Sequence, residues 1–217
     1  MHIHFQSRVR IVLTAFAIGV SALFYACSYL DRDRPNLRFT STIAGIDNSI
    51  GEPFGIAVKD GVTYVSDGEK GVIWRIAADG TATVFASGLD TPSGIAFNTN
   101  GDLIVADSGS NSIIGINSSG KIMTIAGIEA AWISTNHDAV AASFNGPIGI
   151  AVAKDGRVFV ADTYNDRILV IYGGKVATLA GSTAGFAEGT GADSKFNTPT
   201  GLAIWQDKLL VADTGNN

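Results

Sequence analysis

The sequence has little of what catalytic and metal sites are built from. It contains one cysteine and three histidines in 217 residues. A single cysteine excludes an internal disulfide framework, and neither a cysteine–histidine pair nor a Gly-x-Ser-x-Gly turn is present to supply a nucleophile. His137 is the only histidine outside the N-terminal tail, which is too few for a catalytic zinc site with three protein ligands. The sequence therefore predicts neither catalytic residues nor a metal site.

Positive charge is also scarce, since acidic residues outnumber basic ones 20 to 15. A protein of net negative charge repels phosphate backbones, so we expect no nucleic acid partner. The run Gly189-Thr190-Gly191 lacks the lysine of a phosphate-binding loop. No cofactor is evident, and calcium, which takes carboxylate and carbonyl oxygens, is the one ion that the sequence leaves open.

A long apolar run stands near the N-terminus. Residues 11–30 carry no charge and follow Arg8 and Arg10, so a basic flank precedes about one membrane thickness of apolar chain. We expect residues 1–30 to be a signal anchor, a cleaved secretory signal or a lipoprotein signal lipidated at Cys27, with residues 31–38 as a linker. A buried core helix is the remaining alternative. Each signal places the rest of the chain outside the cytoplasm, in the periplasm or at the cell surface.

The sequence is rich in one repeated pattern. Four copies of a Pro-x-Gly phrase are each followed, 14 or 15 residues after the proline, by an apolar run that ends in aspartate. The prolines are Pro53, Pro92, Pro147 and Pro199, and the aspartates are Asp67, Asp107, Asp162 and Asp213. A unit of about forty residues is typical of propeller blades.

The third copy predicts four short antiparallel strands, at residues 149–152, 158–161, 167–171 and 176–180. A two-residue Asp-Gly hairpin turn is expected within residues 154–157 and a Gly-Gly turn at residues 173–174. Because the first strand contains only small and branched apolar residues, we expect it to lie nearest the central axis. The predicted blades occupy residues 53–88, 92–127, 147–181 and, incompletely, 199–217.

The segments 144–152 and 160–168 resemble an NHL repeat, as do residues 196–217. Copies one and two differ from the repeat in the turn after the aspartate, where lysine or serine replaces Asn165 and valine or serine replaces Arg167. The resemblance covers residues 39–217 and implies an all-β propeller, usually of six blades. We therefore expect four-stranded antiparallel blades, three complete with partial first and last blades, after an N-terminal hydrophobic helix.

The two ends of the predicted propeller complement each other. Residues 39–44 match the outermost strand of a blade but no inner strands precede them, whereas residues 199–217 stop half way through a blade. In a closed ring the first segment would complete the last blade. We therefore expect a C-terminally truncated propeller, or one that a partner closes.

One end of the blades is the predicted binding face. The turn after each repeat aspartate and the link to the next blade emerge at the same end, together with the long loops 127–146 and 181–198. The candidate ligand-facing residues of these loops are Trp132, His137, Asp138, Phe186, Glu188 and Asp193. The repeat-turn residues are expected to be structural, because aspartate and asparagine side chains accept backbone N–H bonds in turns. They are Asp67, Asp107, Asp162, Tyr164, Asn165, Arg167 and Asp213.

Three functions remain open. The resemblance implies recognition or scaffolding, so the first hypothesis is an exported, membrane-tethered, non-catalytic module that binds a protein, a peptide or a glycan. The alternative is a metal-dependent lactonase or lyase of the six-bladed propeller type, with part of its catalytic residues in blades beyond this sequence. A sensor domain outside the membrane is the third.

Overall fold

The computed structural model describes residues 50–127 and 143–216, which belong to one compact unit, Ile50–Asn217. Residues 1–30 with Cys27, and the strand expected at residues 39–44, lie outside the described residues. In the described part of the chain, no helix is long and apolar enough to cross a membrane.

The described chain forms three four-stranded sheets and one two-stranded sheet, all antiparallel. The first blade contains β1 (Pro53–Lys59), β2 (Val62–Asp67), β3 (Val72–Ile76) and β4 (Ala82–Ser87). The second contains β5 (Pro92–Phe97), β6 (Leu103–Asp107), β7 (Ser112–Ile116) and β8 (Ile122–Ala126). The third contains β9 (Pro147–Val152), β10 (Val158–Asp162), β11 (Arg167–Tyr172) and β12 (Lys175–Ala180). The last sheet pairs β13 (Pro199–Trp205) with β14 (Lys208–Asp213).

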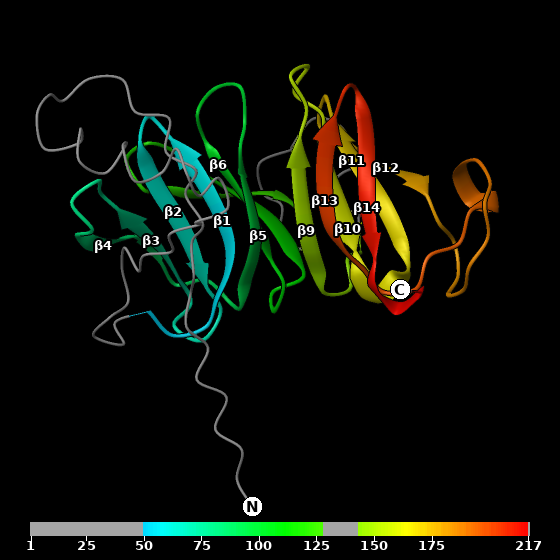
Figure 1. Cartoon of the computed structure of the whole chain (residues 1–217), viewed down its shortest axis with the longest axis horizontal. Coiled ribbons are helices and arrows are strands. Elements are labelled where there is room, and N and C mark those ends of the chain that lie inside the picture. The colour runs from blue at the N-terminus through cyan, green and yellow to red at the C-terminus, as the bar shows by residue number, and fades with distance from the viewer. Residues whose placement is uncertain (1–49, 128–142, 217) are drawn as a thin grey trace, which may run out of the picture. The chain divides into compact units, whose positions relative to one another are not determined.

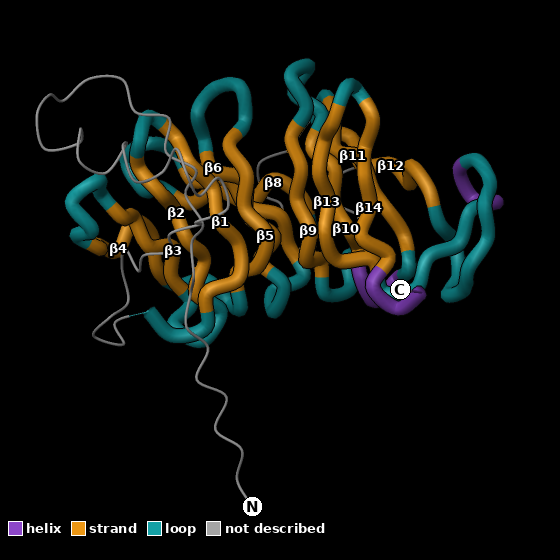
Figure 2. The backbone as a smooth tube through the Cα atoms, viewed as in Figure 1, coloured by secondary structure: helices purple, strands orange, loops and turns teal. Residues whose placement is uncertain are grey.

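Each sheet is an up-and-down meander in sequence order, so the prediction of four-stranded antiparallel blades is confirmed. The first strands of successive blades contact one another, β1 with β5, β5 with β9 and β9 with β13 (Figure 1). Outside the strands the described chain consists of turns, loops and the short 3-10 turns η1 (Thr163–Asn165), η2 (Gly191–Asp193) and η3 (Thr214–Asn216) (Figure 2). The segment that follows each proline is thus the strand through which neighbouring blades meet.

The glycines of the first three Pro-x-Gly phrases lie where the backbones of two neighbouring blades meet. A Cβ atom on Gly149 would meet the carbonyl oxygen of Thr200, and one on Gly94 would meet that of Ile148. Gly55 faces the Ser93 carbonyl in the same way. Because the strands meet backbone to backbone, only glycine fits at these positions.

The hairpin turns differ from the prediction in one place. The third blade does not have the expected two-residue Asp-Gly turn, because Ala153 pairs with Arg157 and leaves three residues in the loop, with Gly156 at φ 89°. The Asp155 carboxylate accepts the backbone N–H of Arg157 at 3.1 Å, which favours this longer loop. The first blade does have a two-residue turn, since Lys59 pairs directly with Val62 across Asp60 and Gly61.

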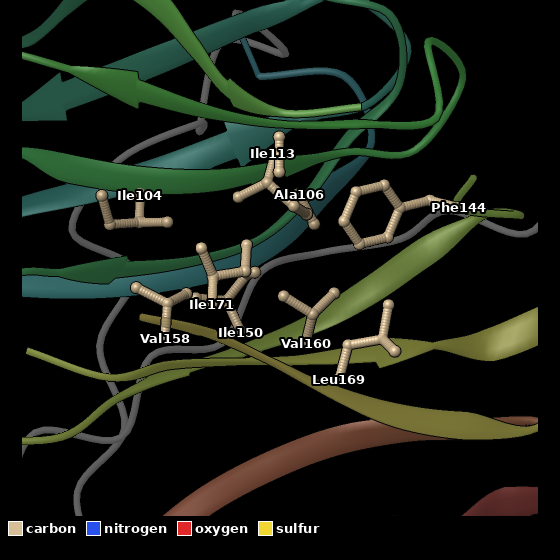
Figure 3. Close-up of a cluster of buried hydrophobic side chains, with 10 residues drawn as sticks. Ile104, Ala106, Ile113, Phe144, Ile150, Val158, Val160, Leu169 and Ile171 are labelled. Carbon is tan, nitrogen blue, oxygen red and sulfur yellow. The ribbon is translucent and has the colours of Figure 1, made fainter. Parts of the chain in front are cut away.

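Apolar side chains from facing sheets form the core between blades. The second blade contributes to this core Ile104, Ala106, Ile113 and Ala126, which pack against residues of the third blade. Phe144, which precedes β9, belongs to the same cluster (Figure 3). Phe144 is 3% exposed and fills the space between the two blades. Figure 3 shows Ile104, Val158 and Ile171 together at one end of this cluster, and Phe144 at the other.

Candidate functional site

The repeat aspartates lie at one end of the blades, here called the loop-bearing end. Asp162 accepts the backbone N–H of Asn145 at 2.7 Å, and Asn145 belongs to the link that enters the third blade. Its other oxygen accepts hydrogen bonds from the Asn165 amide at 2.9 Å and from Arg167 Nε at 2.7 Å. Asp162 therefore ties together the entry to its blade and the turn between the second and third strands.

The same link recurs in every copy, with different partners around it. Asp213 accepts Asn197 N–H and the Asn216 amide, and Asp107 accepts Asp90 N–H and the Ser110 hydroxyl. Sequence reasoning placed these bonds within each aspartate's own turn. The backbone donor, 15 to 17 residues upstream, was missed, although the nearly constant spacing from proline to aspartate is its signal.

The pKa values of the first two repeat aspartates, Asp67 and Asp107, are shifted in opposite directions. Burial raises the pKa of Asp67, but hydrogen bonds from the Trp74 indole at 2.9 Å and from three backbone N–H groups outweigh it, so the net pKa is lowered. Burial also raises the pKa of Asp107, and there the hydrogen bonds from Ser110 and Asp90 do not overcome it. Since hydrogen bonds to a carboxylate favour its charged form, Asp67 is an anion held by its donors.

Arg167 and Tyr164 also serve the turn. Arg167 Nε bonds to Asp162, and its Nη2 donates to the Ser143 carbonyl at 2.8 Å. The Tyr164 ring is 62% exposed and covers Gly146, where a Cβ atom would collide with it. Tyr164 N–H donates to the Asn145 carbonyl at 3.1 Å. These side chains brace the entry loop of the blade, and only the Tyr164 ring presents a large surface to a ligand.

Hydroxyl groups beside the aspartates connect neighbouring blades. The sequence analysis did not predict these hydrogen bonds. Thr163 Oγ1 donates to the Pro199 carbonyl at 2.8 Å, and Ser108 Oγ donates to the Pro147 carbonyl. In the first blade this position is Gly68, and Ser66 donates instead to the Ser93 carbonyl at 2.6 Å. The signal was a serine or threonine directly after three of the four repeat aspartates.

The loop 181–198 is a folded hairpin at the same end. Ala187 pairs with Lys195 as an isolated bridge, and Gly185 N–H donates to the Phe196 carbonyl at 2.9 Å. The Ser194 hydroxyl is buried and closes the 3-10 turn by donating to the Gly191 carbonyl at 2.7 Å. The Asn216 amide, which also contacts Asp213, donates to the Gly185 carbonyl at 2.7 Å. The last repeat turn thus fixes the base of this loop.

The loop presents the candidate ligand-facing residues to solvent. Phe186 is 76% exposed, the largest exposed fraction among the exposed large hydrophobic residues described. Glu188 and Asp193 are also exposed, and Asp193 lies in η2. The remaining candidates, Trp132, His137 and Asp138, lie outside the described residues. Within residues 50–127 and 143–216, no three His, Cys, Asp or Glu side chains gather closely enough to hold a metal ion.

These features define a propeller-type repeat protein with one loop-bearing end. The family model for the NHL repeat matches residues 89–116 and 144–171. The chain belongs to the NHL-repeat family. Its turns differ between copies, but the link from aspartate to blade entry is common to all four.

The chain matches short parts of two much longer curated relatives. The chain is 32% identical over 175 residues to the chloroplastic protein SUPPRESSOR OF QUENCHING 1 of Arabidopsis thaliana, covering 74% of this chain and 16% of that protein. It is 36% identical over 76 residues to NHL repeat-containing protein 2 of Homo sapiens, covering 34% of this chain and 10% of that one.

Solved structures share the fold at low identity. An auxiliary nutrient binding protein from Bacteroides thetaiotaomicron has a TM-score of 0.66 at 15% identity, over 82% of this chain and 48% of that one. A gluconolactonase from Xanthomonas campestris has a TM-score of 0.60 at 18% identity, over 76% and 55%. A virginiamycin B lyase from Staphylococcus aureus has a TM-score of 0.53 at 18% identity, over 75% and 49%. Binding proteins and enzymes both occur on this fold, and the chain spans about half of each.

Proposed function

We propose that this chain is an exported, membrane-tethered NHL-repeat module that binds a protein, peptide or glycan, without catalysis, through its loop-bearing end. The observation that carries the proposal is Phe186, an exposed aromatic ring on a loop that hydrogen bonds hold at its base. Exposed aromatic side chains on ordered loops are the usual anchors of binding surfaces. The repeat carboxylates support a non-catalytic role, because hydrogen bonds within the blades already engage them.

The binding proposal is tested by selection on the immobilised full-length protein with a random-peptide phage library and, in parallel, a glycan array. Enriched ligands should lose about tenfold or more in affinity on Phe186→Ala, the loss typical of a central aromatic contact. Trp205→Ala is the matched control, because Trp205 is 56% exposed on the β13–β14 hairpin at the opposite end. The absence of any enriched ligand, or equal binding by parent and Phe186→Ala, would overturn the proposal. Binding that EDTA abolishes would contradict a site without a metal ion.

Export and tethering rest on the apolar run at residues 11–30 behind Arg8 and Arg10. Expression from the native N-terminus, followed by membrane partitioning and intact mass, tests both. A mass that begins at acylated Cys27 indicates a lipoprotein, and a membrane-bound mass that retains residues 1–30 indicates a signal anchor. Recovery of the intact chain from the cytosolic fraction would overturn the proposal.

A further inference from the structure

A cavity of about 300 Å³ opens between the second and third blades, at the end opposite the loop-bearing end. Its wall consists of apolar side chains from both blades, chiefly Ile104, Met123, Ile125, Val158 and Ile171. Its rim consists of the hairpin turns at residues 98–102 and 172–173. Figure 3 shows three of the wall residues, Ile104, Val158 and Ile171, converging at this end of the core.

The same space between the first and second blades is filled by aromatic rings. Tyr64 packs edge-on against Phe85 and Phe97, with ring centroids 5.1 Å apart in both pairs. Tyr64 pairs with Arg75 and Arg75 with Thr83, just as Ile104 pairs with Gly115 and Gly115 with Met123. The rows of residues across the two blades are therefore equivalent.

Substitution along this row opens the cavity. Isoleucine stands at position 104 where the first blade has Tyr64, and Ile125 stands where it has Phe85. Gly115 replaces Arg75 in the strand between them and lines the cavity. At the second interface the positions equivalent to Tyr64 and Phe85 thus carry isoleucine, and no ring from the second blade's own strands closes the space.

We propose that this cavity binds a small aromatic molecule, a single substituted ring of the size of a phenol or an indole. The filled interface shows that this space between two blades accepts such a ring, since Tyr64 occupies it. An apolar cavity of about 150 Å³ is enough to hold benzene, so the present one holds a ring with a substituent. This site is separate from the loop-bearing end and does not depend on its ligand.

The rim selects the substituent. Asp102 accepts a hydrogen bond from the Asn98 amide at 3.2 Å, and the backbone N–H groups of Asn100 and Asp102 both donate to Asn98 Oδ1 at 2.9 Å. The Asp102 carboxylate therefore favours a hydroxyl or N–H substituent and repels a carboxylate. The exposed ring of Tyr172 stands at the same rim and adds an aromatic surface.

The test is a titration of the full-length, 15N-labelled protein with 4-methylphenol and with indole, followed by NMR. Saturable shifts are expected at the cavity glycines Gly115, Gly156 and Gly173, with a Kd on the order of 1 mM or tighter. Benzoate, which carries a negative charge, and glucose, which is polar, should cause no saturable shift there. Binding of glucose at these residues, or an absence of saturable shifts with both aromatic probes, would overturn the proposal.

Met123→Trp should fill the cavity from its half-buried edge strand and raise the Kd about tenfold or more. Thr83→Trp is the matched control, because Thr83 holds the equivalent position on the first blade and does not line the cavity. Tight binding by Met123→Trp would contradict the assignment. If this variant does not fold, Gly115→Val is tested in the same way. Valine already stands at the equivalent position of the third blade, as Val170.

Discussion

The hydroxyl of Thr163 donates a hydrogen bond of 2.8 Å to the carbonyl oxygen of Pro199, which begins the following blade. Thr163 is 1% exposed, so the bond is sheltered from water. It connects the residue after one repeat aspartate with the strand that enters the next blade. The repeat therefore encodes contacts between blades as well as each blade's own strands.

Replacing this threonine should weaken the contact between the third and fourth blades. Thr163→Val keeps the shape of the side chain but leaves the Pro199 carbonyl unsatisfied, which typically costs about 1–3 kcal/mol. Urea unfolding measures this loss in the free energy of unfolding. Thr214→Val is the control, because the exposed Thr214 hydroxyl bonds to the Thr200 hydroxyl within one blade, and it should cost less than about 0.5 kcal/mol. Equal losses in the two variants would show that the contact between blades adds nothing.

Asp67 and Asp107 should respond differently to the same substitution. Asp67 accepts four hydrogen bonds, from Trp74 and from three backbone N–H groups, so an amide cannot satisfy every donor. We expect Asp67→Asn to lower the free energy of unfolding by about 1–3 kcal/mol. Asp107→Asn should cost less, since the Ser110 hydroxyl can turn to accept the new amide N–H. Urea unfolding of both variants checks the order, and a larger loss for Asp107→Asn would contradict it.

The pH dependence of stability should follow the lowered pKa of Asp67. A carboxyl whose pKa is lower in the folded protein stabilises the fold above its unfolded pKa, and this stability is lost as the pH falls through the folded value. The stability difference between the parent and Asp67→Asn should therefore be full at neutral pH. It should shrink as the pH falls below about 4, the usual value for aspartate. A difference that stays constant down to acid unfolding would exclude the ionised carboxylate as its source.

The glycines of the Pro-x-Gly phrase should tolerate alanine only where no strand of a neighbouring blade lies opposite in the described part of the chain. Gly149→Ala places a Cβ against the Thr200 carbonyl, so we expect a loss of about 1–3 kcal/mol. The nearest atom to a Cβ at Gly201 is the Ala212 Cβ, at 3.2 Å. Gly201→Ala should therefore cost less than about 1 kcal/mol, and thermal unfolding of both variants tests the contrast. If Gly201→Ala were as destabilising as Gly149→Ala, a further blade would have to occupy that side in solution.

Sequence periodicity was enough to predict the blades, because each strand is a short apolar run between turns rich in glycine. The hairpin at Ala153–Arg157 did not follow, because the Asp155 side chain decides the turn length. The bond from Asn145 N–H to Asp162 was missed, because the proline-to-aspartate spacing does not by itself show that these two residues meet when the blade closes.

The cavity between the second and third blades illustrates the same limit. The change from Arg75 to Gly115 is visible in the aligned copies, but its effect depends on which side chains share the row across two blades. Only the register of the strands places Ile104 beside Gly115 and Tyr64 beside Arg75. Smaller side chains in one blade leave a cavity only when the neighbouring blade does not fill the space.

Ligand binding at the loop-bearing end can be mapped by hydrogen–deuterium exchange of the full-length protein with and without a selected peptide or glycan. Bound ligand should slow exchange in the segment 182–196 that contains Phe186, and leave the hairpin turns at residues 153–157 and 205–208 unchanged. Protection at those hairpin turns instead, or no protection in the segment 182–196, would show that ligand does not bind at the loop-bearing end.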